Sequence, residues 1–143
     1  MKLLVSLGSN IGDKQQNIER AIALIDERIG SVVKKSSFYY TEPVGFMSEN
    51  YFINAAIEIK TYLPIYRILK IIQKIEHLMG RTQKSSKGVY HDRIIDIDIL
   101  TYGNKKIHSA RLTVPHPRMY ERDFVMKPLR DYEIGRASCR ERV

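Results

Sequence analysis

The clearest pattern along the chain is the strict alternation of isoleucine and aspartate over residues 95–99. Alternation with period two, built on β-branched residues, predicts a β-strand, which we place at residues 94–102. Successive side chains of a strand point to opposite faces of its sheet. The isoleucines are therefore expected to share one face, and Asp96 and Asp98 are expected to share the other.

The remaining apolar pattern predicts an α+β domain. Residues 3–7 are almost continuously apolar, as in a central strand. Apolar residues recur at helical spacing over 13–30 and 64–80, and strands are expected at 31–41 and 51–60. This is the βαββαβ order of a ferredoxin-like fold. We expect an antiparallel sheet with both helices on the isoleucine face.

Polar candidates gather on the opposite face of this sheet. The strand at 51–60 directs its isoleucines to the core, which leaves Phe52 and Asn54 on the face that carries Asp96 and Asp98. An aromatic ring and an amide can hold a flat heterocycle by stacking and by hydrogen bonds to its edge. This convergence favours a catalytic site over a metal site alone.

The acidic pair itself suggests a cation. Two carboxylates one pleat apart repel each other, and Mg²⁺ usually takes one or two carboxylates together with substrate phosphates. Arg93 lies just upstream and is suited to bind a phosphate through two parallel hydrogen bonds. The alternative is an amphipathic strand whose solvent face carries two aspartates.

Composition adds limits rather than chemistry. A chain of 143 residues with 43% hydrophobic and 28% charged residues is expected to form one globular domain. The net charge of +8 favours an anionic partner. No segment has the pattern of a signal peptide or a membrane span. The single cysteine, Cys139, cannot form an internal disulfide, which favours the cytoplasm.

Three polar segments are expected to be loops. Residues 8–13 form either a tight turn or a phosphate loop, although they lack the Lys-Ser/Thr of a P-loop. Residues 41–50 contain proline and glycine, which mark a binding loop. Residues 81–92 are basic and lack apolar anchors, so we expect a mobile loop that can fold over phosphates.

The last ten residues differ from the rest of the chain. Residues 134–143 show no apolar period, and they resemble one reading frame of a sequencing-adapter oligonucleotide. We therefore expect one domain over residues 1–133, truncated at its C-terminus, and a non-native tail that includes Cys139. The alternative is a native basic tail.

Seven short motifs occur in order over residues 3–132. The most specific are Arg93–Leu100, which contains the acidic pair, and the run Arg-Leu-Thr-Val-Pro-His-Pro at 111–117. The others are Gly8-Ser9-Asn10-x-Gly12-Asp13, Phe38-Tyr39-x-Thr41-x-Pro43, Asn54-Ala55-Ala56, Gln73-x-Ile75-Glu76 and Gly80-Arg81. Together they resemble the 6-hydroxymethyl-7,8-dihydropterin pyrophosphokinase family of folate biosynthesis.

The resemblance implies a fold, a reaction and partners. Members of this family fold as a ferredoxin-like αβα sandwich and transfer pyrophosphate from ATP to the pterin hydroxymethyl group, releasing AMP. It implies two Mg²⁺ ions and a monomer that binds ATP and the pterin, but no nucleic acid and no membrane.

The resemblance also implies residue roles. Asp96 and Asp98 would hold the metal ions and act in catalysis with Arg81 and Arg93. The pterin would be bound by Thr41, Pro43, Val44, Phe52, Asn54 and Phe124. ATP would be bound by Gln73, Glu76, Arg93, Ile99, Arg111, Leu112, Thr113, His116 and Arg122. His116 has an alternative reading as a structural residue of a Pro-His-Pro turn.

The basic loop departs from the family pattern. His91 and Asp92 stand where many members have Gly-Pro, and Gln83 stands where a second arginine is common. The loop is therefore expected to cover the phosphates differently. Two other classes remain open: a nucleic-acid-binding ferredoxin-like module, which would need exposed aromatics on its central strands, and a metal-dependent nucleotidyltransferase or phosphatase.

Overall fold

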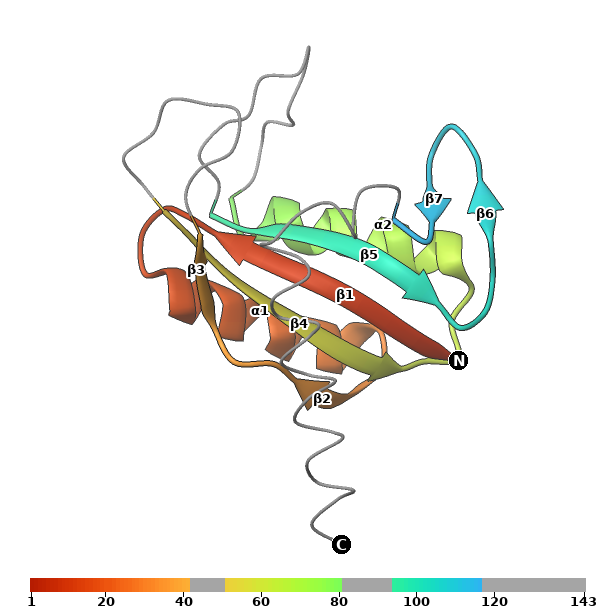
Figure 1. Ribbon diagram of the computed structural model, residues 1–143, viewed down its shortest axis with the longest axis horizontal. Coiled ribbons are helices and arrows are strands. Elements are labelled where there is room, and N and C mark those ends of the chain that lie inside the picture. Colours follow the sequence, from red (N-terminus) through yellow and green to blue (C-terminus); the bar gives the residue numbers. More distant parts are fainter. Residues whose placement is uncertain (42–50, 81–93, 117–143) are drawn as a thin grey trace, which may run out of the picture.

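The computed structural model describes residues 1–41, 51–80 and 94–116 (Figure 1). Within these ranges the elements form a single α+β unit built on one main sheet. In chain order they are β1 (Lys2–Ser9), α1 (Lys14–Arg28), β2 (Ser31–Lys35), β3 (Tyr39–Thr41), β4 (Phe52–Lys60), α2 (Ile65–Leu78), β5 (Asp96–Tyr102), β6 (Ile107–His108) and β7 (Thr113–Val114).

The main sheet is antiparallel and runs in the order β2-β4-β1-β5, and β3 also pairs with β4. The strand at the N-terminus therefore lies inside the sheet, between β4 and β5 (Figure 1). Together with the element order, this arrangement confirms the expected ferredoxin-like α+β fold. It also brings two strands that are distant in sequence, β4 and β5, to either side of β1.

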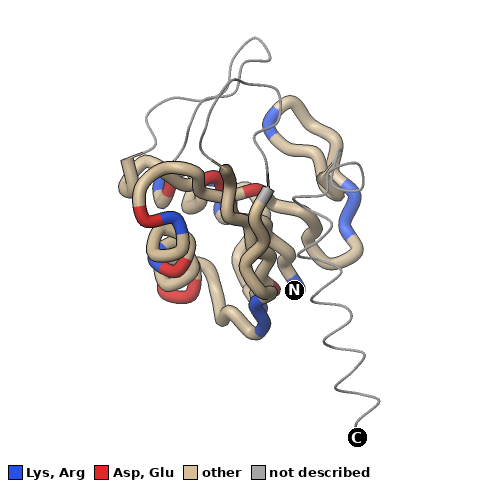
Figure 2. The backbone as a smooth tube through the Cα atoms, turned by 60° about the vertical axis from the view of Figure 1, so that its left-hand side comes forward, with Lys and Arg blue, Asp and Glu red and all other residues tan. Residues whose placement is uncertain are grey.

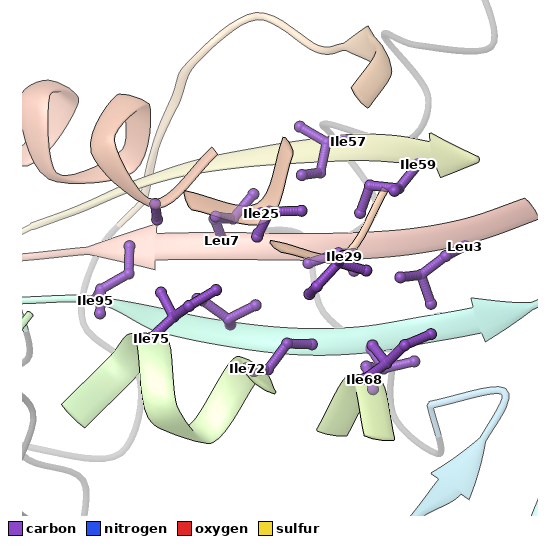
Figure 3. Close-up of a cluster of buried hydrophobic side chains, with 14 of the residues drawn as sticks. Leu3, Leu7, Ile25, Ile29, Ile57, Ile59, Ile68, Ile72, Ile75 and Ile95 are labelled. Carbon is purple, nitrogen blue, oxygen red and sulfur yellow. The ribbon is translucent and has the colours of Figure 1, made fainter. Parts of the chain in front are cut away.

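The core lies between the sheet and the helices. Figure 3 shows isoleucines of α2 packed against the residues of β1 and β5. Every second residue of β1 from Leu3 to Leu7 belongs to this core, and Leu3, Val5 and Leu7 are fully buried. At about 25 cal/mol per Å² of apolar area removed from water, such side chains each contribute roughly 1.5–3 kcal/mol to folding. Helix α1 begins at the expected position because Asp13 Oδ1 accepts a hydrogen bond from the Gln16 N–H at 3.2 Å.

Both described helices cover the same face of the sheet, so the described residues form two layers. The third layer of an αβα sandwich does not occur within residues 1–41, 51–80 and 94–116. None of the helices in these ranges is long and apolar enough to cross a membrane.

The prediction of a single strand at residues 31–41 is wrong. The structure divides it into β2 and β3, because Ser36 leaves the regular strand pattern to bind Ala56 directly. The Ser36 N–H donates to Ala56 O, and Ser36 Oγ accepts from the Ala56 N–H, both at 2.9 Å. The chain thus stays attached to β4 while it changes direction.

The strand expected at 94–102 begins later and contains an irregularity. It starts at Asp96, and Leu100 has no counterpart in β1, because Leu4 pairs with Thr101 while Val5 pairs with Ile99. One extra residue shifts the alternation of the side chains that follow it. Tyr102 consequently reaches the helix side, where its hydroxyl donates to Leu63 O at 2.8 Å.

Candidate active site

Strand β1 carries the residue at the centre of the candidate site. Gly8 pairs with Asn54 of β4 on one side and with Asp96 of β5 on the other. Two residues earlier, Ser6 pairs with Asp98. Directly paired residues of neighbouring strands share a face, and strands lie about 4.8 Å apart. The amide and the first carboxylate therefore flank Gly8, with their Cα atoms roughly 10 Å apart.

The absence of a side chain at Gly8 leaves room for its neighbours on β4. A Cβ atom there would lie 2.9 Å from Asn54 Oδ1 and 3.5 Å from Phe52 Cδ1. The amide of Asn54 and the ring of Phe52 therefore both lean toward Gly8. Asn54 is 4% exposed, whereas Phe52 is half-buried. A buried amide beside a partly open ring can read the polar edge of a flat ligand.

The prediction of a turn or phosphate loop at residues 8–13 is wrong for Gly8. The structure shows it inside β1, two residues before the turn begins. Glycine within a strand often marks a place where another group approaches the backbone closely. The almost continuous apolar run at residues 3–7, directly before Gly8, is the sequence signal that Gly8 continues the strand.

The two aspartates are half-buried at the start of β5, on the face opposite the helices. They are separated by one residue, so their Cα atoms lie roughly 6.5 Å apart. The described residues contain no group of three or more His, Cys, Asp or Glu side chains placed to hold a metal. A pair of carboxylates fits Mg²⁺, which takes one or two carboxylates and completes its shell with phosphates and water.

Several residues expected to bind ATP lie along the edge of β5 that faces away from β1. Near its start, Glu76 Oε2 of α2 accepts a hydrogen bond from the Ile97 N–H at 3.0 Å. Near its end, the His116 N–H donates to Leu100 O at 2.9 Å. Gln73 precedes Glu76 by one turn of α2, so it lies on a neighbouring position of that helix.

The other described ATP candidates differ in exposure. Ile99 is 5% exposed and its side chain belongs to the core. Leu112 also packs against the core, while Thr113 is half-buried in β7. Arg111 is exposed in the turn between β6 and β7, beyond the end of β5.

The remaining candidates are only partly described. Thr41 ends β3, where its backbone pairs with Phe52. The following lie outside the described residues, as does the expected tail at 134–143: Pro43, Val44, Arg81, Arg93, Arg122 and Phe124.

Two bacterial proteins are similar to this chain over most of its length. The chain is 48% identical over 128 residues to a 2-amino-4-hydroxy-6-hydroxymethyldihydropteridine pyrophosphokinase of Porphyromonas gingivalis, covering 89% of this chain and 87% of that one. It is 44% identical over 126 residues to the Bacillus subtilis enzyme of the same name, covering 87% of this chain and 74% of that one.

Solved structures support the fold. The wild-type HPPK-DHPS of Plasmodium falciparum with pteroate aligns with a TM-score of 0.72 over 91% of this chain, at 16% sequence identity. The alignment spans 38% of that longer chain, so the likeness concerns the fold alone.

The model of one protein family matches residues 4–134, which is nearly the whole domain expected from the sequence. Its description is 7,8-dihydro-6-hydroxymethylpterin-pyrophosphokinase, abbreviated HPPK. Together with the two bacterial relatives, this match shows that the chain belongs to the 7,8-dihydro-6-hydroxymethylpterin-pyrophosphokinase family.

Proposed function

We propose that the chain binds the dihydropterin over Gly8 and ATP along β5, with the reacting groups beside Asp96 and Asp98. Membership of the family makes the chain a pyrophosphokinase of folate biosynthesis. The observation that carries the proposed site is the pairing of Gly8 with both Asn54 and Asp96. This pairing places the amide of Asn54, which can form hydrogen bonds to a ring, on one side of Gly8. It places the carboxylate of Asp96 on the other side.

The pterin half of the site rests on β4. Asn54 has a donor and an acceptor in one side chain, which matches an aminopyrimidinone edge that also presents both. Phe52 supplies one wall for the ring, and Phe124 is proposed as the second wall. Thr41, Pro43 and Val44 are proposed to contact the ring edge. The missing side chain at Gly8 lets the ring approach the backbone closely.

The metal half rests on β5. Asp96 and Asp98 are proposed to hold two Mg²⁺ ions together with the phosphates of ATP. When bound, such ions neutralise charge on the phosphates and help orient an in-line displacement. The position of Asp96 on the strand next to Gly8 supports a transfer site at one end of the pterin.

The transfer moves two phosphoryl groups together. The pterin hydroxymethyl oxygen forms a bond to the β-phosphorus of ATP, the bond between that phosphorus and the bridging oxygen of the α-phosphate breaks, and AMP leaves. The hydroxyl proton passes from the attacking oxygen to solvent water. Arg81 and Arg93 are proposed to stabilise the charge on the phosphates, since guanidinium groups stay protonated and match phosphate geometry.

The ATP half uses the outer edge of β5. Gln73, Glu76, Thr113 and His116 are proposed to contact the nucleotide, with Ile99 offering its backbone. Leu112, Arg111 and Arg122 complete this group. One oxygen of Glu76 already binds the Ile97 N–H, so Glu76 also holds β5 in place beside the nucleotide.

We also propose that the protein is a cytoplasmic monomer that binds no nucleic acid and no membrane. A nucleic-acid module is expected to collect its basic residues on one face. Figure 2 shows the Lys and Arg positions of the described chain on several separate elements instead. RNA titration at two salt concentrations tests the absence of nucleic-acid binding, because phosphate-driven binding weakens steeply with salt. We expect no binding at either concentration.

Calorimetry tests the proposed division of the site. The pterin is titrated into the protein with and without Mg²⁺ and a nonhydrolysable ATP analogue, and the analogue is titrated alone. We expect separate sites for the two ligands and tighter pterin binding in the presence of the analogue. Competition between the pterin and the analogue for one site would contradict the proposal.

A further inference from the structure

Tyr66, near the start of α2, touches the turn that carries Arg111. The Tyr66 hydroxyl donates a hydrogen bond to Ser109 Oγ at 2.9 Å. The guanidinium carbon of Arg111 lies over the Tyr66 ring, 5.0 Å from its centroid. Attraction between a cation and an aromatic face acts within about 6 Å of the centroid. One side chain of α2 therefore contacts the turn in two different ways.

Ser109 is the residue that closes this turn. Its N–H donates to Leu112 O at 2.9 Å, its Oγ donates to the same oxygen at 3.2 Å, and its Oγ accepts from the Leu112 N–H at 3.1 Å. The Tyr66 hydroxyl adds a further donor to that Oγ. A chain of hydrogen bonds thus runs from α2 into the backbone that carries Arg111.

This contact bears on Arg111 because the side chain is exposed and belongs to a short turn. An exposed arginine samples many rotamers, and binding must restrict them. A guanidinium placed over an aromatic face keeps its N–H donors in its own plane, where they remain able to bind an anion. Tyr66 is 36% exposed and lies outside the hydrophobic core cluster of the described residues, so packing does not account for it.

We propose that Tyr66 is a positioning residue for Arg111 in ATP binding. Its hydroxyl fixes the turn through Ser109, and its ring limits the directions that the guanidinium takes before the nucleotide arrives. The inference rests on the proposed assignment of Arg111 to the ATP half of the site. Tyr66 itself touches no reacting group.

A double-mutant cycle tests the inference. Tyr66→Leu removes both contacts, Tyr66→Phe removes the hydroxyl alone, and Arg111→Ala removes the group that is positioned. Tyr62→Leu is the matched control, since Tyr62 is a nearby tyrosine that is 86% exposed. For each variant the Kd of a nonhydrolysable ATP analogue, the Kd of the pterin, the rate of AMP formation and the Tm are measured.

We expect Tyr66→Leu to weaken binding of the ATP analogue about threefold to tenfold, as the loss of one exposed cation–π contact and one hydrogen bond implies. Tyr66→Phe should fall between this variant and wild type. Pterin affinity and the Tyr62→Leu control should not change. In the Arg111→Ala background, Tyr66→Leu should have no further effect on the analogue.

Equal loss from Tyr66→Leu in both backgrounds, or equal loss of pterin binding, would overturn the positioning role and leave the proposed function intact. If Arg111→Ala binds the analogue as tightly as wild type does, Arg111 does not bind ATP. The inference would then be overturned, because Tyr66 would have no ATP-binding residue to position. Wild-type AMP formation from ATP and the pterin shows separately whether the proposed function holds.

Discussion

The carboxylate of Glu76 binds the backbone of the strand at a point between the two aspartates. Glu76 Oε2 accepts a hydrogen bond from the Ile97 N–H at 3.0 Å, and Ile97 separates Asp96 from Asp98. N–H groups alternate between the two edges of a strand, so this one points away from β1. Helix α2 therefore holds the segment that carries the proposed metal ligands.

Replacing Glu76 tests this attachment. Glu76→Leu should lower the free energy of unfolding by about 1–2 kcal/mol, because a partly buried N–H loses a charged acceptor. It should also slow turnover, since Asp96 and Asp98 lose their common support. Glu76→Gln keeps an oxygen that can accept the bond, so it should retain more stability and more activity. Chemical denaturation measures the free energy of unfolding, and AMP formation measures turnover. If Glu76→Leu matches wild type in both, Glu76 does not support β5.

Gly8 should be the position in β1 where a methyl group does most harm to pterin binding. Gly8→Ala places a Cβ atom 2.9 Å from Asn54 Oδ1, which must move aside. The displaced atom is the end of a side chain, so the fold should survive. We expect pterin binding to weaken by about tenfold or more, as the loss of a hydrogen bond and of close contact implies, while ATP binding is retained.

A second glycine serves as the control for this experiment. Gly30→Ala would press its Cβ atom against the backbone oxygen of Lys60, far from the site. It should lower the Tm without a specific effect on pterin affinity in the protein that remains folded. If Gly8→Ala behaves in the same way as Gly30→Ala, then Gly8 serves the fold alone.

Phe52 and Asn54 separate a pterin site from a general phosphotransferase site. Phe52→Ala should weaken pterin binding by roughly tenfold to a few hundredfold, corresponding to ~1.5–3 kcal/mol of lost burial. Binding of the ATP analogue should change little. Weaker binding of the analogue with unchanged pterin affinity would mean that the two substrates are assigned to the wrong sides of the acidic pair.

Asn54→Leu probes recognition of the ring edge. A site built to hydrogen-bond a polar edge rejects analogues that lack it, because its own polar groups are left unpaired. The variant should therefore lose discrimination between the pterin and an analogue without the 2-amino group. Calorimetric titration of both compounds into wild type and variant measures the ratio of affinities. A ratio equal to that of wild type would show that Asn54 does not read this edge.

The parts of the fold that depend on local pattern could be predicted from the sequence. Alternation over residues 95–99 indicates the strand, and the same rule places Asn54 and Asp96 on one face, which their shared pairing with Gly8 confirms. Helical spacing indicated α1 and α2, and Asp13 indicated where α1 begins. These features follow from periods of two and 3.6 residues.

Features that depend on distant partners could not be predicted. The break between β2 and β3 arises because Ser36 binds Ala56, twenty residues away. That Leu100 has no counterpart in β1 appears only when β5 is aligned with β1. The contact between Glu76 and Ile97 depends on how α2 packs against the sheet. The local amino-acid sequence contains no signal for any of these contacts.

The turnover of the aspartate variants tests the central claim most directly. AMP formation from ATP, Mg²⁺ and the pterin is measured for wild type, Asp96→Ala, Asp98→Ala and, as a control, Glu27→Ala, whose side chain is exposed on α1. We predict that each aspartate variant folds with a Tm near that of wild type but forms no measurable AMP, while Glu27→Ala is unchanged. Removing one carboxylate relieves repulsion with the other and can even raise the Tm. A near-wild-type rate for either aspartate variant at saturating Mg²⁺ would contradict the claim that this pair is the centre of the active site.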